Sequence, residues 1–146
     1  MLKSILIGTA LLLATSVSHA ALGGEWNGWG DWTFQGSGAH CDTMKLQFNE
    51  TQSQLQRVSG YFDCGITALQ LPEQTFQKNG KDLLVDGQVV GSVEADTYKW
   101  TERYSDTVKV QNLLQVEGHH MTYTETWIGS DGQTIYVITG RLFFKE

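Results

Sequence analysis

Three polar residues in the last third of the chain occupy positions where chemistry could be done. Glu102, Asn112 and Glu125 are each flanked, two residues away on both sides, by apolar or aromatic side chains. Successive side chains of a β-strand point to opposite faces, so each polar group shares a face with apolar neighbours. A carboxylate or amide in such surroundings must be hydrogen-bonded, paired or protonated. The pattern predicts either a small-molecule site or a set of polar groups that satisfy one another.

Three short turns decide which of these residues are neighbours. Turns at 105–107, 118–119 and 131–132 set Trp100 opposite Asn112, and Asn112 opposite Glu125. A slip of one residue would exchange the two faces of every strand. The three turns agree on one largely apolar inner face, and they leave Thr122, Thr124 and Thr126 on the outer face.

The predicted function follows from this inner face. Aromatic walls with a few convergent polar groups are the usual form of a small-molecule site. We expect a small β-barrel that binds a small amphipathic or apolar ligand in its lumen, with Asn112 and Glu125 orienting the polar end of that ligand. The residues expected to line the lumen are Tyr98, Trp100, Glu102, Asn112, Tyr123, Glu125, Trp127 and Tyr136. The alternative is an exported protein-binding or inhibitor domain with a filled interior.

An enzyme that uses the interior carboxylates is the least favoured alternative. Strand geometry separates Glu102 and Glu125 by about 11–12 Å at the backbone. Glycosidases need carboxyl groups about 5 Å apart, or up to about 9.5 Å for inversion. The chain has no nucleophile-elbow, phosphate-loop or dinucleotide-binding pattern, and the neighbouring His119 and His120 fall in a turn without ligand spacing. We therefore expect no catalytic residues, no metal and no cofactor.

The start of the chain has the pattern of a secretory signal peptide. Lys3 precedes an apolar run at 5–14, and Ser18-His19-Ala20 matches a cleavage site. We expect a signal peptide at 1–20, one β-barrel domain at 21–146, a periplasmic or secreted location, and no integral membrane segment after cleavage. Residues 1–20 contain one lysine and no acidic residue, so their removal changes the net charge from −6 to −7. That charge argues against nucleic acid as a partner.

The two cysteines are expected to form a disulfide. Cys41 and Cys64 are the only cysteines of the chain, and an oxidising compartment favours their pairing. With Met44 opposite Phe62, however, Cys41 falls one residue out of step with Cys64. Either Cys41 lies in a loop before its strand, or a β-bulge intervenes.

The remaining sequence completes an all-β pattern. Short alternating segments separated by glycine-containing turns predict about eight to ten antiparallel strands in an up-and-down order. Such a meander closes into a barrel, which removes its open edges. In the third strand Val58, Gly60 and Phe62 are expected to face inward, and Gly91 is placed opposite Trp100. The only proline, Pro72, interrupts pairing in 66–82, where the course of the chain is left open.

Gly24-Glu25-Trp26 resembles the G-x-W motif on the first strand of lipocalins and related calycins. In that family an arginine near the end of the last strand packs over the tryptophan and helps close the barrel, and Arg141 is the matching position. The resemblance implies a barrel that binds a small, often apolar molecule. Strand alternation places Arg141 on the outer face. The small exported barrels that inhibit lysozymes resemble this chain in size and in their disulfide.

Overall fold

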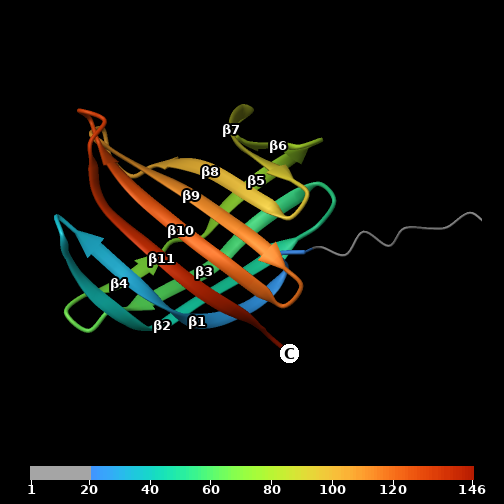
Figure 1. Cartoon of the computed structure of the whole chain (residues 1–146). Coiled ribbons are helices and arrows are strands. Elements are labelled where there is room, and N and C mark those ends of the chain that lie inside the picture. The colour runs from blue at the N-terminus through green and yellow to red at the C-terminus, as the bar shows by residue number, and fades with distance from the viewer. Residues whose placement is uncertain (1–20) are drawn as a thin grey trace, which may run out of the picture.

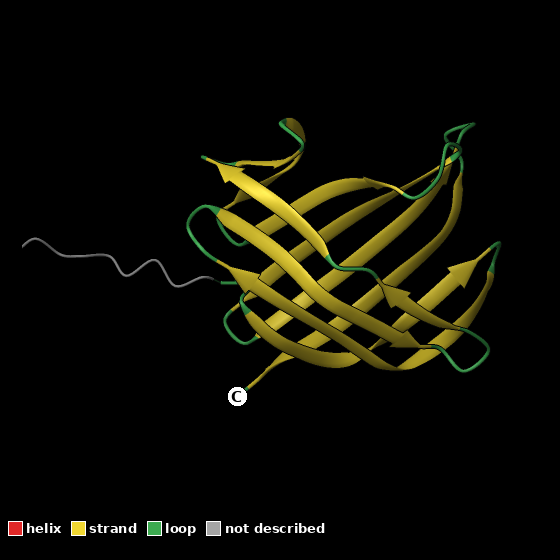
Figure 2. Cartoon of the chain, turned by 180° about the vertical axis from the view of Figure 1, so that it is seen from behind, coloured by secondary structure: helices red, strands yellow, loops and turns green. Residues whose placement is uncertain are grey.

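The computed structural model describes residues 21–146, which form antiparallel β-strands and no helix (Figures 1 and 2). The expected signal peptide lies outside these residues. None of the described residues forms a helix of the length and hydropathy needed to cross a membrane. The strands are β1 (Gly24–Phe34), β2 (Ser37–Glu50), β3 (Gln54–Asp63), β4 (Ala68–Leu71), β5 (Gln74–Asn79), β6 (Asp82–Val85), β7 (Gln88–Glu94), β8 (Thr97–Arg103), β9 (Val108–Glu117), β10 (His120–Gly129) and β11 (Thr134–Lys145).

The strands close into a calycin-like barrel, as the sequence predicts. Each strand except β4 pairs with the next along the chain, and β1 pairs with both β2 and β11. Strands β4 and β5 both lie along β3, end to end, with Pro72 and Glu73 between them. Proline has no backbone N–H to give to a ladder, so the pairing is interrupted there. Eleven strands therefore occupy ten positions around the ring.

The two ends of the barrel differ. Turns 35–36, 64–67, 104–107 and 130–133 lie at one end, here called the aromatic end for its side chains, and the β6–β7 hairpin projects apart from them (Figure 1). Turns 51–53, 80–81, 95–96 and 118–119 lie at the other end together with residues 21 and 146, and we call it the terminal end. Figure 1 shows the C-terminus on this side of the barrel.

The register predicted for the last four strands is confirmed. Trp100 pairs with Asn112, Asn112 with Glu125, and Glu125 with Ile138. Gly91 is opposite Trp100, as expected. A Cβ atom at this glycine would lie 2.1 Å from the Lys99 carbonyl oxygen and 2.6 Å from the Trp100 Cβ atom. Only glycine allows this approach without displacing the backbone of β8.

Two β-bulges account for the differences from the expected pattern. The pairing of β2 with β3 shifts between Gln47 and Phe48, so Val58 becomes an extra residue and Arg57 pairs with Phe48. The prediction that Val58 faces inward is therefore wrong, and the buried Arg57 takes that place. A second shift, between Gly28 and Gly30 on β1, marks an extra residue in β2. This bulge removes the mismatch of the cysteines, and the predicted disulfide between Cys41 and Cys64 is present.

Candidate functional site

A chain of hydrogen-bonded side chains crosses the barrel interior. It starts at the Arg57 guanidinium on β3, whose Nη2 and Nη1 atoms donate to Glu102 Oε1 at 2.8 Å and Oε2 at 3.2 Å. Its Nε atom donates to the Pro72 carbonyl oxygen at 3.0 Å. Two parallel bonds to one carboxylate form the strongest kind of side-chain ion pair. Arg57 is 2% exposed, whereas the Glu102 side chain is 20% exposed.

The same chain continues to the opposite wall. Asn112 Nδ2 donates to Glu102 Oε2 at 3.0 Å, and the Tyr123 hydroxyl donates to Asn112 Oδ1 at 3.1 Å. The Tyr123 hydroxyl also contacts Glu125 Oε2, and Trp127 Nε1 donates to Glu125 Oε1 at 2.5 Å. We call Arg57, Glu102, Asn112, Tyr123 and Glu125 the buried polar network. It lies on four strands that only the closed barrel brings together.

Glu125 is the most enclosed member of the buried polar network, at 0% exposure. Burial raises the pKa of its carboxyl group above the ordinary value of 4.5, and hydrogen bonds from Tyr123 and Trp127 partly oppose this rise. Burial and the nearby Glu125 also raise the pKa of Tyr123 well above its ordinary range. The Tyr123 hydroxyl thus lies between Asn112 Oδ1 and the Glu125 carboxyl group.

The raised pKa of Glu125 predicts a pH dependence of stability that Glu125→Gln should remove. A carboxyl group with a raised folded-state pKa binds more protons when folded. Its stabilising contribution is complete below the ordinary pKa of 4.5 and is lost as the pH rises through the folded-state pKa. We expect urea unfolding across this window to show a declining free energy of unfolding for the wild type and a flatter curve for Glu125→Gln. Parallel curves would contradict a raised pKa at this position.

An aromatic cluster lies at the end of the barrel next to the buried polar network. Trp127 stacks on Tyr136 with ring centroids 4.9 Å apart, and Tyr104 meets the edge of Trp127 at 4.6 Å. Trp32 contacts Tyr136 at 5.6 Å and stacks on Phe34 at 6.2 Å. We call these five residues the mouth aromatic cluster. Its residues come from β1, β11, β10 and the turn that follows β8. Its outer members are exposed: Tyr104 is 68% and Phe34 is 37% exposed.

Glu102 connects the buried polar network with this end of the barrel. On the inner face of β8, Trp100 precedes it and is buried, whereas Tyr104 follows it and is exposed. The Glu102 side chain, which is 20% exposed, therefore lies between a buried and an exposed residue of the same face. An apolar mouth with a partly accessible carboxylate below it could hold a molecule that has both an apolar and a polar part.

The eight residues predicted to line the lumen all lie on the inner wall, but they separate into three groups. Glu102, Trp127 and Tyr136 reach the aromatic end. Trp100, Asn112, Tyr123 and Glu125 lie deeper, at 3% exposure or less. The polar atoms of Asn112 and Glu125 are engaged by neighbouring side chains, and a role of this pair in orienting a ligand stays a prediction. The Trp100 indole nitrogen has no partner among the described residues.

Tyr98, the eighth residue, belongs to a separate group at the terminal end. Its hydroxyl lies 3.0 Å from Glu50 Oε2, and Lys78 Nζ lies 2.8 Å from Glu50 Oε1. The backbone N–H of Leu22 donates to the same Glu50 carboxylate at 3.0 Å. Leu22 is completely buried, so the start of the described chain closes this end of the barrel.

The two residues assigned to barrel closure have different places. Trp26 is buried near the terminal end, donates from Nε1 to the Leu22 carbonyl oxygen at 2.9 Å, and packs against Phe144 at 5.3 Å. Arg141 lies exposed on the outer face of β11, opposite Trp29. An arginine–tryptophan contact like the one that the resemblance implies is therefore not formed, because strand alternation directs the two side chains to opposite faces.

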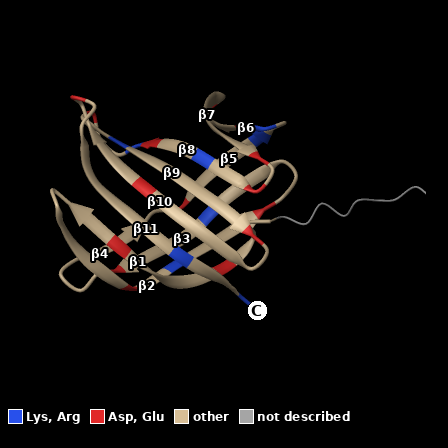
Figure 3. Ribbon diagram, in the orientation of Figure 1, with Lys and Arg blue, Asp and Glu red and all other residues tan. Residues whose placement is uncertain are grey.

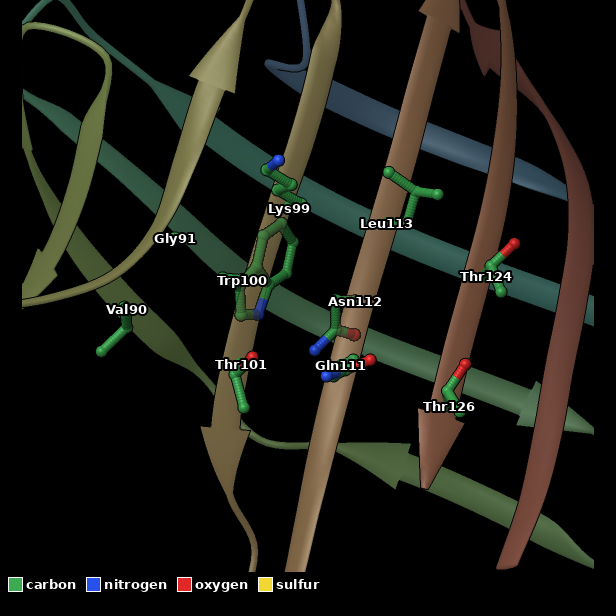
Figure 4. A pocket seen from close by; sticks show the side chains of 10 residues that line it. All are labelled: Val90, Gly91, Lys99, Trp100, Thr101, Gln111, Asn112, Leu113, Thr124 and Thr126. Atoms are coloured by element: carbon green, nitrogen blue, oxygen red, sulfur yellow. The ribbon is translucent and has the colours of Figure 1, made fainter. Parts of the chain in front are cut away.

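The outer face carries shallow hollows and one exposed aromatic pair. One hollow has a volume of about 440 Å³. Figure 4 shows that Lys99, Leu113, Thr124 and Thr126, which line it, come from three adjacent strands. This hollow lies outside the barrel, as the alternation of these residues requires. Trp29 is 47% exposed and its ring centroid lies 5.3 Å from that of Phe143. Among residues 21–146, no three His, Cys, Asp or Glu side chains are arranged to hold a metal ion.

The residue that sequence reasoning missed is Arg57. The alternation of side chains along the third strand predicts an inward-facing Val58, because nothing in its sequence marks the β-bulge. One feature of the sequence points to a buried cation: an inward-facing Glu102 carboxylate needs a positive partner or a proton.

Comparison with known proteins supports the fold and nothing finer. No protein-family model matches the chain, and neither does any curated protein sequence. The crystal structure of Rv2717c from M. tuberculosis has a TM-score of 0.61 at 10% identity, covering 87% of this chain and 94% of that one. The S-type phycobiliprotein lyase CPES from Guillardia theta has a TM-score of 0.58 at 8% identity, covering 86% of this chain and 89% of its own.

A third solved structure, of a protein of unknown function in the DUF3598 family from Nostoc punctiforme, has a TM-score of 0.50 at 11% identity. It aligns over 86% of this chain but only 48% of that longer one. At these identities the likeness concerns the calycin-like barrel fold alone.

Proposed function

We propose that this protein is an exported small-molecule-binding barrel whose ligand enters at the aromatic end. The apolar part of the ligand packs on the mouth aromatic cluster, and its polar part meets the accessible edge of Glu102. The disulfide between Cys41 and Cys64 supports a periplasmic or secreted location, since such bonds persist in oxidising compartments.

The observation that carries this proposal is the combination of exposure and chemistry at one end of the barrel. Five rings form an unbroken set of contacts there, and the outermost of them are left exposed. A structural core would bury such rings, whereas a binding site leaves them available. The polar residues deeper in the barrel bond one another, so the ligand does not have to reach them.

A second candidate function is protein binding through the outer face. The exposed pair of Trp29 and Phe143 favours it, and so does the tight packing of the barrel centre. Aromatic side chains are enriched at protein interfaces. This candidate predicts that Trp29, and not the mouth aromatic cluster, responds to the natural partner.

The proposed site can be tested with a neutral fluorescent amphipathic probe, N-phenyl-naphthylamine. We expect saturable binding to the wild-type protein and about 3- to 10-fold weaker binding to Tyr104→Ala, because one aromatic contact is lost. Tyr104 is largely exposed, so its removal should leave the fold intact, which circular dichroism would verify.

Tyr61→Ala is the matched control, since Tyr61 is an exposed tyrosine on the outer face of β3 at 39% exposure. It should bind the probe as the wild type does. Equal weakening in both variants, or an unchanged affinity in Tyr104→Ala, would contradict a site at the aromatic end.

A further inference from the structure

We propose that the ligand of the aromatic end is an organic cation, such as an ammonium group on an apolar body. This inference rests on the proposed function, because it names the class of molecule that the same site accepts. Three features favour a cation: the faces of the mouth aromatic cluster, the charge balance of the buried polar network and the charge of the surrounding turns.

The mouth aromatic cluster offers the first part of a cation site. Two tryptophans, two tyrosines and one phenylalanine gather with neighbouring ring centroids 4.6–6.2 Å apart. The face of an aromatic ring is electron-rich and attracts a cation within about 6 Å of its centroid. Several rings around one position are the arrangement that recognises ammonium groups in general.

The buried polar network offers no cation to an incoming anion. Arg57 is its only positive group, and the guanidinium is bonded twice to the Glu102 carboxylate and once to the Pro72 carbonyl oxygen. An anion entering from the aromatic end would approach the Glu102 carboxylate, whose only cation is already bonded to it. A cation at the same place gains a favourable interaction with that carboxylate.

The turns at the aromatic end add negative charge. The four turns there contain Asp106 and Asp131 and no lysine or arginine. Asp106 is paired with Arg103, so Asp131 supplies the negative charge at this edge. Figure 3 shows the tip of the β10–β11 turn in red at the edge of this end. Acidic side chains around an opening raise the local concentration of cations.

The test compares three probes that share one aromatic body and differ in charge: naphthylmethyl-trimethylammonium, naphthylmethanol and naphthylacetate. Isothermal titration calorimetry should give an affinity for the ammonium probe about tenfold higher than for the alcohol. The acetate should bind more weakly than the alcohol. Added sodium chloride should weaken ammonium binding and leave alcohol binding unchanged.

Two variants separate charge from aromatic contact. The variant Asp131→Asn removes the charge and keeps a side-chain oxygen that can accept from the Gln133 backbone N–H. It should lose about twofold to fivefold in affinity for the ammonium probe and nothing for the alcohol. Tyr104→Ala should weaken all probes, with Tyr61→Ala as its control.

The outcomes distinguish this inference from the function on which it rests. If the acetate or the alcohol binds as tightly as the ammonium probe, and Tyr104→Ala weakens all of them, the cation preference is overturned while the binding site stands. If none of the three probes binds the wild-type protein, both the inference and the proposed function are overturned.

Discussion

Glu102→Gln is expected to lower the free energy of unfolding by about 3 kcal/mol, the largest loss we predict for a single substitution. It leaves the Arg57 guanidinium buried at 2% exposure without its counter-charge. A buried charge that loses its partner costs more than the pair was worth. Glutamine still accepts hydrogen bonds, so the loss reports mainly on charge.

The reciprocal substitution gives the internal control. Arg57→Met leaves a carboxylate that is 20% exposed and partly solvated, so it should cost less than Glu102→Gln. The double variant Arg57→Met/Glu102→Gln removes both charges and should be more stable than Glu102→Gln alone. Urea unfolding of the four proteins forms a double-mutant cycle. Losses that simply add would show that the two side chains do not interact.

Removal of the disulfide is the second large effect. Cys41→Ala/Cys64→Ala should lower the free energy of unfolding by about 3 kcal/mol, because the bond closes a loop with a sequence separation of 23 residues. Without it the unfolded chain gains conformational entropy. The bond also ties the bulged part of β2 to the end of β3.

Reductant supplies the control for this prediction. It should reduce the stability of the wild type to that of the double alanine variant and leave that variant unchanged. A loss below about 1 kcal/mol would indicate that the unfolded chain is not restrained by this bond.

The sequence was sufficient to predict the last four strands, because several independent signals coincide there. Turn residues at 118–119 and 131–132 fix the pairing, and the apolar faces of the strands agree with it. Each strand in this part pairs with its neighbour in sequence, so local information sets the register. The eight inner-wall residues were placed on the correct face for this reason.

The contents of the site could not be predicted in the same way. Arg57 reaches Glu102 across the barrel over 45 residues, after a bulge that shifts its strand by one residue. The alternation of side chains along a strand does not show whether Asn112 and Glu125 bond a ligand or neighbouring side chains, because this depends on packing between strands. The sequence allows both arrangements. In the structure the two residues bond neighbouring side chains.

The sequence predicts only part of the mouth aromatic cluster. The strand register places Trp127 and Tyr136 in the lumen, and the contact between their rings follows from the pairing of these two residues. Trp32 and Phe34 join them because β1 pairs with β11 and closes the barrel. That pairing joins the two ends of the chain, so no local pattern predicts it.

The central claim is that a small molecule binds at the aromatic end. Its most direct test follows the indole N–H signals of isotope-labelled tryptophan by nuclear magnetic resonance while naphthylmethyl-trimethylammonium and naphthylmethanol are added in turn. The account predicts that the signals of Trp32 and Trp127 shift and saturate with at least one probe, while those of Trp26 and Trp29 do not change. Saturable shifts at Trp29, with Trp32 and Trp127 unchanged, would contradict it and would indicate binding at the outer face.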